Sequence, residues 1–272
     1  MSPAEAYMVL TDRAKLKVAR AFSRASGVAV LLFAPAVLLA QAGPQAGDDE
    51  LAKSIVEKAD HVRFPVEPFE VGVTISSTGS NVTEDVRQYR IFAKGRENTI
   101  VMVTEPASDR GQVLLLKGHD LWIFLPTLSQ PVRLSLSQRL TGQVANGDLA
   151  RTNFAGDYVA KLLRTEKSDN ESFYVLELTA VDRSVTYHRV MYWVRQSNYW
   201  PHKAEFYSLS DRLLKTCLYQ SYKPMAGRER PTRLVMQNAL LKDEESVLEY
   251  SSMRLRDLPD RMFTKDYLKR LE

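Results

Sequence analysis

The feature that most constrains this fold is a change in hydrophobic period after Pro65 and Pro68. Before these prolines, apolar residues recur every three or four positions, which predicts a helix over residues 48–62. The residues that share its apolar face are Leu51, Ile55, Ala59 and Val62. After the prolines the period falls to two, which predicts β-strands. We therefore expect one helix followed by a long series of strands.

The predicted strands are short, and turn signals such as Lys94-Gly95 and Ser210-Asp211 separate several of them. They cover residues 69–75, 89–93, 99–103, 112–116, 121–125, 132–136, 172–179, 189–194, 203–207, 213–222, 232–238 and 247–255. A second helix is predicted within residues 153–163 and a short one within residues 261–271. Strands and helices do not alternate, which argues against a parallel nucleotide-binding sheet. The pattern predicts a single, mainly β (α+β) domain whose antiparallel sheet curls.

The N-terminal 42 residues have the order of a secretory signal peptide. A basic segment at residues 13–24 precedes an apolar run at residues 27–40, and Ala40-Gln41-Ala42 supplies a small-x-small cleavage site. We predict a signal peptide over residues 1–42 and a mature domain over residues 43–272, with Met8 as an alternative start. The rival interpretation is an uncleaved membrane anchor. No cysteine follows the apolar run, so the chain is expected to be exported to the periplasm without lipidation.

Charge and cysteine content exclude several classes of protein. The formal net charge is +4, but residues 1–42 account for +3 of it. The nearly neutral remainder has no basic footprint for nucleic acid. Cys217 is the only cysteine, so no internal disulfide can form. Its place in an apolar strand predicts a buried side chain.

Motifs for catalysis and metal binding are missing from the sequence. The four histidines lack zinc-ligand spacing, and neither a G-x-S-x-G elbow nor a glycine-rich phosphate loop occurs. Asp182, Arg183 and His188 are interpreted as a solvated turn, and residues 243–245 as a solvated hairpin loop. We expect no enzymatic activity, no cofactor and no metal.

Several strands are apolar at every position, notably residues 113–116, 121–125 and 190–194. A sheet with one face in water would show strict alternation, so these strands need cover on both faces. Two arrangements meet this need. One is a closed core in which helices pack on the sheet, and the other is a curved sheet that encloses a pocket for an apolar ligand.

Residues 122–154 carry motifs of a known family. Trp122 and Pro126 fit a Trp-x-aromatic-Leu-Pro strand, Arg133 fits a basic position in the next strand, and Gly147-Asp148-Leu149 fits a motif that opens a helix. Thr152-Asn153 stands where many relatives have an acidic pair. With further matches along residues 62–271, the chain resembles the LolA-like outer-membrane lipoprotein-sorting family.

This resemblance implies an antiparallel half-barrel whose concave face is covered by helices. It also implies a monomeric periplasmic carrier that binds acyl chains of a lipoprotein or lipid and shuttles them toward the outer membrane. Its partners would be an inner-membrane transporter and an outer-membrane acceptor. The alternative is a non-catalytic envelope-stress or assembly module that binds a protein partner with the same fold. A hydrolase acting on envelope lipids would need a nucleophile that the sequence does not display.

The expected cavity lining follows from the same resemblance, with Phe154 and Tyr158 placed on the covering helix. The candidate lining residues are Leu114, Leu116, Trp122, Phe124, Leu134, Leu136, Phe154 and Tyr158. The opposite strand face, with Leu115, Leu121, Ile123 and Leu125, is the open alternative. Arg133 is expected either to meet a lipid headgroup or to form a cross-strand pair.

Overall fold

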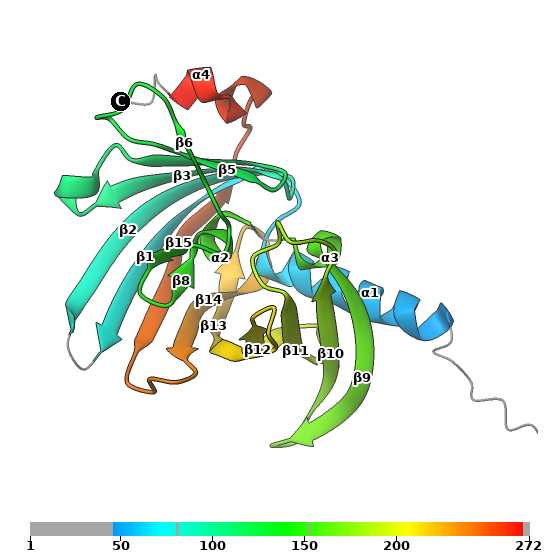
Figure 1. The fold of residues 1–272 in the computed structure, drawn as a ribbon. Coiled ribbons are helices and arrows are strands. Elements are labelled where there is room, and N and C mark those ends of the chain that lie inside the picture. The colour runs from blue at the N-terminus through cyan, green and yellow to red at the C-terminus, as the bar shows by residue number, and fades with distance from the viewer. Residues whose placement is uncertain (1–45, 80–81, 152, 269–272) are drawn as a thin grey trace, which may run out of the picture. The chain divides into compact units, whose positions relative to one another are not determined.

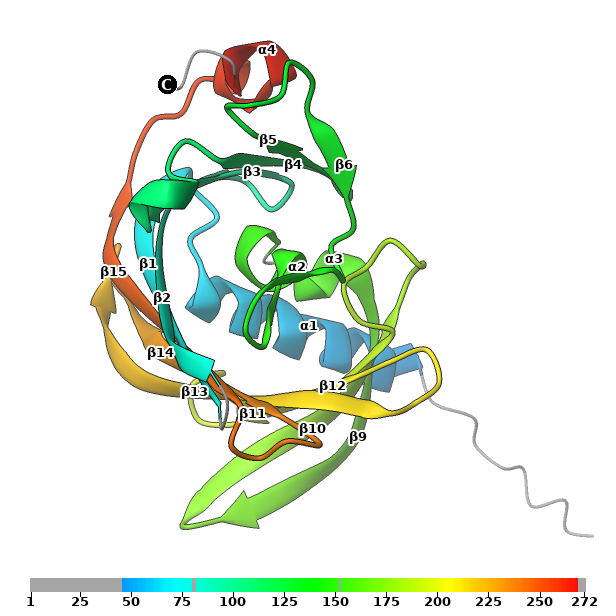
Figure 2. The ribbon, with the colours of Figure 1, turned by 60° about the vertical axis from the view of Figure 1, so that its left-hand side comes forward.

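The computed structural model describes residues 46–79, 82–151 and 153–268, so the predicted signal peptide lies outside the described residues. Across these ranges, thirteen strands form one antiparallel sheet that curves without closing into a barrel (Figures 1 and 2). A short hairpin, β7 (Arg139–Thr141) and β8 (Val144–Ala145), lies apart from it. The predicted curved, mainly β half-barrel is confirmed.

Two meanders in sequence order make up the sheet. The first holds β1 (Phe69–Gly79), β2 (Val82–Lys94), β3 (Asn98–Glu105), β4 (Val113–Lys117), β5 (Asp120–Phe124) and β6 (Val132–Leu134). The second holds β9 (Tyr158–Ser168), β10 (Glu171–Ala180), β11 (Arg189–Arg195), β12 (Pro201–Tyr207), β13 (Leu213–Met225), β14 (Arg228–Asn238) and β15 (Glu245–Leu255). Pairing of β1 with β15 joins the two meanders and leaves β6 and β9 as edges. The positions predicted as strands lie in or beside these elements.

Helix α1 (Ala46–Arg63) runs through the hollow of the curved sheet (Figure 2). Acidic residues in its first turn and basic residues in its last turn complement the helix dipole. Its C-terminal carbonyls are capped from the sheet, because Arg230 Nη1 donates to the carbonyls of His61 (2.8 Å) and Val62 (3.1 Å). This contact fixes where α1 ends on the concave face.

The apolar stripe of α1 differs from the prediction at its first position. Ile55, Ala59 and Val62 are buried as expected, and Ala52 and Val56 join them. Leu51 is 43% exposed although its neighbour Ala52 is fully buried, because the buried face of α1 is centred on Ala52, Ile55, Val56 and Ala59 and Leu51 lies to one side of it.

The helix predicted within residues 153–163 is wrong for most of its length. Helix α3 (Phe154–Asp157) is a single turn, and the chain then continues as β9 alongside β10. The burial along β9 has a period of two at its start, where Tyr158 and Ala160 are buried while Val159 and Lys161 are exposed. Pairing with β10 therefore decides the structure of this segment.

Apolar side chains cover both faces of the first meander, as its continuous apolar strands predict. The larger cluster lies on the concave face, among the sheet, α1, α2 (Asn146–Ala150) and α3. A smaller cluster on the other face joins β3, β4 and β5 to the C-terminal segment with η2 (Asp260–Phe263) and α4 (Lys265–Leu268). The short helix expected within residues 261–271 is thus present. A further single turn, η1 (Ala107–Asp109), links β3 to β4.

Candidate ligand-binding site

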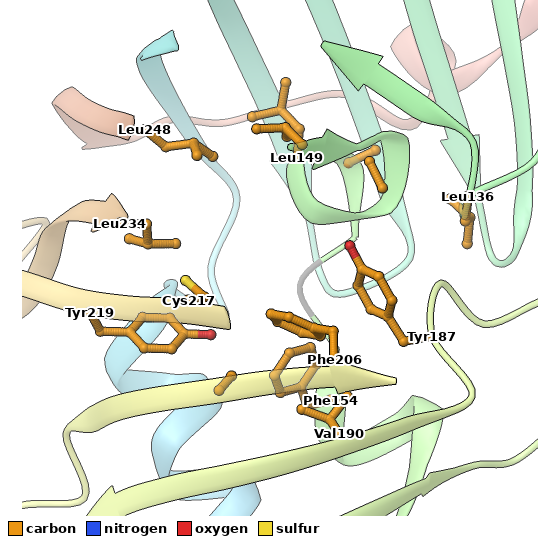
Figure 3. Close-up of a cluster of buried hydrophobic side chains, with 14 of the residues drawn as sticks. Leu136, Leu149, Phe154, Tyr187, Val190, Phe206, Cys217, Tyr219, Leu234 and Leu248 are labelled. Carbon is orange, nitrogen blue, oxygen red and sulfur yellow. The ribbon is translucent and has the colours of Figure 1, made fainter. Parts of the chain in front are cut away.

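The concave face holds a continuous cluster of apolar and aromatic side chains (Figure 3). Tyr219 from β13, Phe206 from β12, Phe154 from α3 and Tyr187 from the β10–β11 connection gather near its middle. Cys217 is buried here, and burial raises the pKa of its thiol to about 12, so it behaves as the predicted buried hydrophobe.

The segment between β6 and β9, here called the plug segment (residues 135–151 and 153–157), crosses the concave face and carries β7, β8, α2 and α3 (Figure 2). Polar contacts tie its hairpin to the sheet. Thr141 Oγ1 donates to Asp85 Oδ2 (2.8 Å), and the backbone amide of Gln143 donates to Ser246 Oγ (2.9 Å). The plug segment is therefore attached largely through side chains and not as a strand of the large sheet.

A buried ion pair links α2 to the sheet. Lys215 Nζ from β13 contacts Asp148 Oδ2 at 2.5 Å, and the hydroxyl of Tyr187 donates to the same carboxylate at 2.8 Å. Asp148 also stabilises the start of α2, because its Oδ2 accepts a hydrogen bond from the backbone amide of Ala145. Helix α2 approaches the β10–β11 connection closely at Gly147, where a Cβ would lie 1.9 Å from Thr186 Oγ1. Gly147 and Asp148 of the family motif are thus structural positions of the plug segment.

A second buried ion pair lies at the end of the plug segment. Arg151 bonds the Asp157 carboxylate through Nε (2.5 Å) and Nη2, and its Nη1 donates to the carbonyl of Gly118 at 2.6 Å. His119 Nε2 lies 3.0 Å from Asp157 Oδ1. These contacts hold α3 against the β4–β5 turn.

A third buried ionic group joins α1 to the plug segment. Asp60 contacts Arg63 Nη1 at 3.2 Å and Arg96 Nη1 at 2.9 Å, and it accepts from the backbone amide of Ala155 at 2.9 Å. Burial raises the pKa of the Asp60 carboxyl above its usual value, although both arginines and the amide oppose this effect. The guanidinium of Arg63 lies over the Phe154 ring, 4.1 Å from its centroid.

Three pockets meet at Tyr187. An interior pocket of about 20 Å³, enough for roughly one water molecule, is lined by residues that include Arg63, Phe154, Tyr187 and Tyr219. Two surface pockets of about 250 Å³ and 300 Å³ share Tyr187 and Leu214 in their linings. Tyr187, held by Asp148, therefore stands between the surface pockets and the interior one.

The surface pockets have apolar rims. Leu240, in the β14–β15 connection, lines the 250 Å³ pocket and is 71% exposed. Leu209, in the β12–β13 connection, lines the 300 Å³ pocket and is 67% exposed. We call these two pockets together the mouth. Asp182, Arg183 and His188, interpreted from the sequence as a solvated turn, line the mouth as well, and Asp182 Oδ1 accepts from the amide of Ser184.

The structure divides the candidate lining residues of β4, β5, β6 and the start of the plug segment, where Leu136 lies, between the two sheet faces. Leu114, Leu116, Leu134 and Leu136 belong to or pack against the concave cluster. Trp122 and Phe124 belong to the cluster under the C-terminal segment on the other face. The reason is the register of the β4–β5 hairpin, in which Leu114 faces Ile123 and Leu115 faces Trp122. Of the opposite-face alternative, Leu121 and Ile123 are the ones that join the concave cluster.

The remaining candidate residues come from three different elements. Phe154 lies on α3 and Tyr158 is the first residue of β9, and both are buried in the concave cluster. Tyr158 is therefore not on a covering helix. Arg133 lies opposite Trp122 in the sheet, has a side chain 72% exposed, and forms an ion pair with Asp120. This is the cross-strand type of contact that the sequence offered as one alternative for Arg133.

The buried charged residues of the concave face were not among the sequence candidates. One signal for them exists, because Lys215 shares the inward face of β13 with Cys217 and Tyr219. A lysine at such a position predicts a buried partner. The partner, Asp148, lies 67 residues away along the chain and could not be assigned from one sequence.

Within the described ranges, no cluster of three or more His, Cys, Asp or Glu side chains is arranged to hold a metal ion. No helix among the same residues combines the length and apolar character needed to cross a membrane.

Comparison with known proteins places this geometry in a family. A family model described as an uncharacterized protein matches residues 95–270. Among solved structures, a LolA superfamily protein from Nitrosomonas europaea is 60% identical, with a TM-score of 0.77 over 79% of this chain and 98% of that chain. The chain belongs to the LolA superfamily. The resemblance found in the sequence motifs is therefore confirmed.

More distant LolA-like structures share the fold. A DUF1329 family protein from Desulfovibrio piger is 20% identical with a TM-score of 0.71 over 81% of this chain and 99% of that chain. A Vibrio parahaemolyticus domain that bears the name outer membrane lipoprotein-sorting protein is 22% identical, with the same TM-score and coverage. No curated protein matches the chain.

Proposed function

We propose that this LolA superfamily protein is a periplasmic carrier that binds acyl chains of a lipoprotein or lipid and shuttles them toward the outer membrane. The observation that carries the proposal is the continuous apolar cluster between the curved sheet and the helices that cover it. Burial of acyl methylenes there would contribute about 0.8 kcal/mol each and would need no reactive group. A non-catalytic role accords with this mode of binding.

The sequence of residues 1–42 supports export. Cleavage after Ala42 would release a mature domain over residues 43–272 into the periplasm. An inner-membrane transporter that loads the carrier and an outer-membrane acceptor that unloads it are the proposed partners. The name of the Vibrio parahaemolyticus domain points in the same direction.

We place the path of the acyl chain from the mouth past Tyr187 to the interior pocket. Of the proposed lining residues, Phe154 and Tyr158 line the interior pocket, while Leu114 and Leu134 line a separate pocket of about 230 Å³ between the first meander and the plug segment. Leu116 and Leu136, the other two, are buried in the same concave cluster. Trp122, Phe124 and Arg133 are left out because they belong to the other sheet face. The interior pocket holds about 20 Å³, so the plug segment must move before a chain can enter.

The first test is to purify the processed chain from the periplasm of a Gram-negative host. Native mass spectrometry and lipid extraction should show a chain that begins at Gly43 and carries acyl-chain lipid. A protein that is consistently empty and binds neither a fluorescent fatty-acid analogue nor a triacylated lipopeptide would contradict the proposal.

Matched surface variants test the path. We expect L209S combined with L240S at the mouth to slow uptake of the fluorescent analogue severalfold. L255S, at the far end of β15 and 52% exposed, should leave uptake unchanged. All three side chains are exposed, so the fold should tolerate the changes. If the L209S/L240S protein and the L255S protein took up the analogue equally fast, the acyl chain would not enter through the mouth.

The exposed mouth also favours a second candidate, a module that binds a protein partner. Leu209 and Leu240 would then receive apolar side chains of that partner. A stable complex that persists when excess triacylated lipopeptide is added would support this alternative over the carrier.

A further inference from the structure

The ionic groups around α1 and the plug segment hold one more cation than carboxylates, with Arg96 22% exposed and the other members buried. Among the described residues, the ionic contacts are Lys215 with Asp148, Arg151 with Asp157, and both Arg63 and Arg96 with Asp60. Arg230 is buried too, but its donors are used by backbone carbonyls at the end of α1 and at Met225. The excess positive charge therefore lies at Arg63 and Arg96.

Arg63 is the member of this pair that faces the ligand space. Its guanidinium lines the interior pocket, while its hydrogen bonding within the described residues is limited to Asp60. Aromatic rings surround the rest of it, with Phe154 at 4.1 Å and Tyr219 at 6.0 Å from Cζ. A guanidinium has five N–H donors in a planar fork, so Arg63 retains donors for a further acceptor.

Tyr192 supplies a second, independent sign of a missing acceptor. Its side chain is fully buried, and its hydroxyl has no hydrogen-bond partner among the residues that the structure describes. Its ring lies 5.5 Å from that of Phe154 and 6.2 Å from that of Tyr219, centroid to centroid. Burial raises the pKa of Tyr192 and of Tyr219 well above the usual phenol value, so both hydroxyls stay protonated and can donate.

We propose that Arg63 and Tyr192, with Tyr219 beside them, bind the carboxylate of a free fatty acid whose chain extends past Tyr187 toward the mouth. This inference rests on the proposed function, because it needs the concave face to admit an acyl chain. A carboxylate has two oxygens that can accept from the guanidinium and from a phenol. An ester-linked acyl chain offers no such anion.

Charge favours this assignment. When Arg63 turns to the ligand, Asp60 keeps its contacts with Arg96 and with the amide of Ala155. The interior pocket beside Arg63 holds about 20 Å³, so the carboxylate would enter only after the plug segment moves. The two carboxylates that line this pocket, Asp148 and Asp157, are already paired with Lys215 and Arg151, which leaves Arg63 as the cation for the ligand. The apolar chain would then lie among the concave-face side chains.

The experiment compares palmitate with methyl palmitate, which has the same chain without the charge. Binding is measured by displacement of a fluorescent fatty-acid analogue from the processed, delipidated chain. We expect palmitate to bind about tenfold or more tightly than the ester, as for a charge-assisted hydrogen bond in a dry site.

Tyr192→Phe is the decisive variant, because it removes only a hydroxyl that lacks a partner. It should leave the unliganded protein as stable as the wild type or more so, and weaken palmitate binding severalfold without changing ester binding. Tyr222→Phe, on β13 but outside the concave cluster, where the ring stacks on Trp200 and the hydroxyl donates to the carbonyl of Pro201, is the control and should change neither affinity. Arg63→Gln should abolish the preference for palmitate if the variant folds.

Equal affinities for palmitate and its ester, or unchanged palmitate affinity in Tyr192→Phe, would overturn the inference. Binding of a triacylated lipopeptide in that case would leave the carrier proposal standing. If the lipopeptide, palmitate and methyl palmitate all failed to bind, both the carrier proposal and the fatty-acid inference would be overturned.

Discussion

Lys215 brings a charge into an apolar cluster, and its ion pair with Asp148 holds α2 on the sheet. We expect Lys215→Met to lower the free energy of unfolding by about 3–5 kcal/mol, because it leaves Asp148 buried without its cation. Arg233→Met, which removes an exposed pair with Glu249, should cost less than about 1 kcal/mol. Urea denaturation measures both. If the two variants lost similar amounts of unfolding free energy, burial would not make the Lys215–Asp148 pair more stabilising than the exposed Arg233–Glu249 pair.

Gly147 allows α2 to approach the β10–β11 connection. A Cβ there would lie 1.9 Å from Thr186 Oγ1 and 2.9 Å from Thr186 Cβ, so Gly147→Ala should destabilise the protein by about 2 kcal/mol or more through overpacking. Thr186→Ala removes the closest atoms and should restore part of that loss in the double variant. Gly47→Ala in α1, where a Cβ meets no atom within 4 Å, should be neutral or stabilising. Thermal unfolding of the wild type and these four variants checks this, and strictly additive effects at positions 147 and 186 would contradict the close contact.

At the scale of elements, the sequence predicts strands better than it predicts which faces they share. The strand patterns of β4 and β5 are correct, but the assumed common face of Leu116 and Trp122 is not, because Leu116 pairs with Leu121. Directly paired residues share a face, and the two-residue turn at Gly118 pairs even-numbered with odd-numbered positions. The register of the β4–β5 hairpin depends on that turn. Because both strands are apolar at every position, no alternation of apolar and polar residues shows which side chains face the concave side.

The junction of β1 and β15 offers a test by pH. Glu70 Oε2 accepts from Arg254 Nη2 (3.1 Å) and Arg256 Nη1 (2.6 Å), and these arginines hold the pKa of Glu70 below its usual value of 4.5 against the opposing effect of burial. Its stabilising contribution is therefore present above pH 4.5 and is lost as pH falls through the lowered pKa. Glu70→Gln should cost about 1–2 kcal/mol at pH 7, since both arginines are largely exposed.

Chemical denaturation of wild type and Glu70→Gln from pH 7 to pH 3 measures this difference. We expect the gap in unfolding free energy to narrow as the pH drops below 4.5. Other carboxyl groups titrate in both proteins and cancel in the comparison. A gap that stays constant over the whole range would contradict the role given to the arginines.

For the whole molecule, the sequence and its family resemblance led to a curved sheet covered by helices, and the structure agrees. The plug segment was harder to foresee. Its helices are single turns or little more, and its attachment depends on pairs such as Thr141 with Asp85, which are 56 residues apart. Such contacts leave no periodic signal in one sequence. The closed plug segment also explains why the pocket beside Tyr187 holds only about 20 Å³, while a pocket of about 230 Å³ remains between the plug segment and the first meander.

Fixing the plug segment to the sheet should therefore stop ligand uptake. Thr141→Cys with Asp85→Cys places thiols where the native side chains are in hydrogen-bond contact, and a short cleavable dithiol-reactive cross-linker would join β7 to β2. Cys217 is buried and its pKa is raised, so it should not react. Gln237→Cys with Glu245→Cys links two strands that already pair, β14 and β15, and serves as the control.

We expect the β7–β2 link to abolish binding of the fluorescent fatty-acid analogue and cleavage of the linker to restore it, while the control binds throughout. Binding by the β7–β2 linked protein at the wild-type level would show that acyl chains reach the concave face without moving the plug segment.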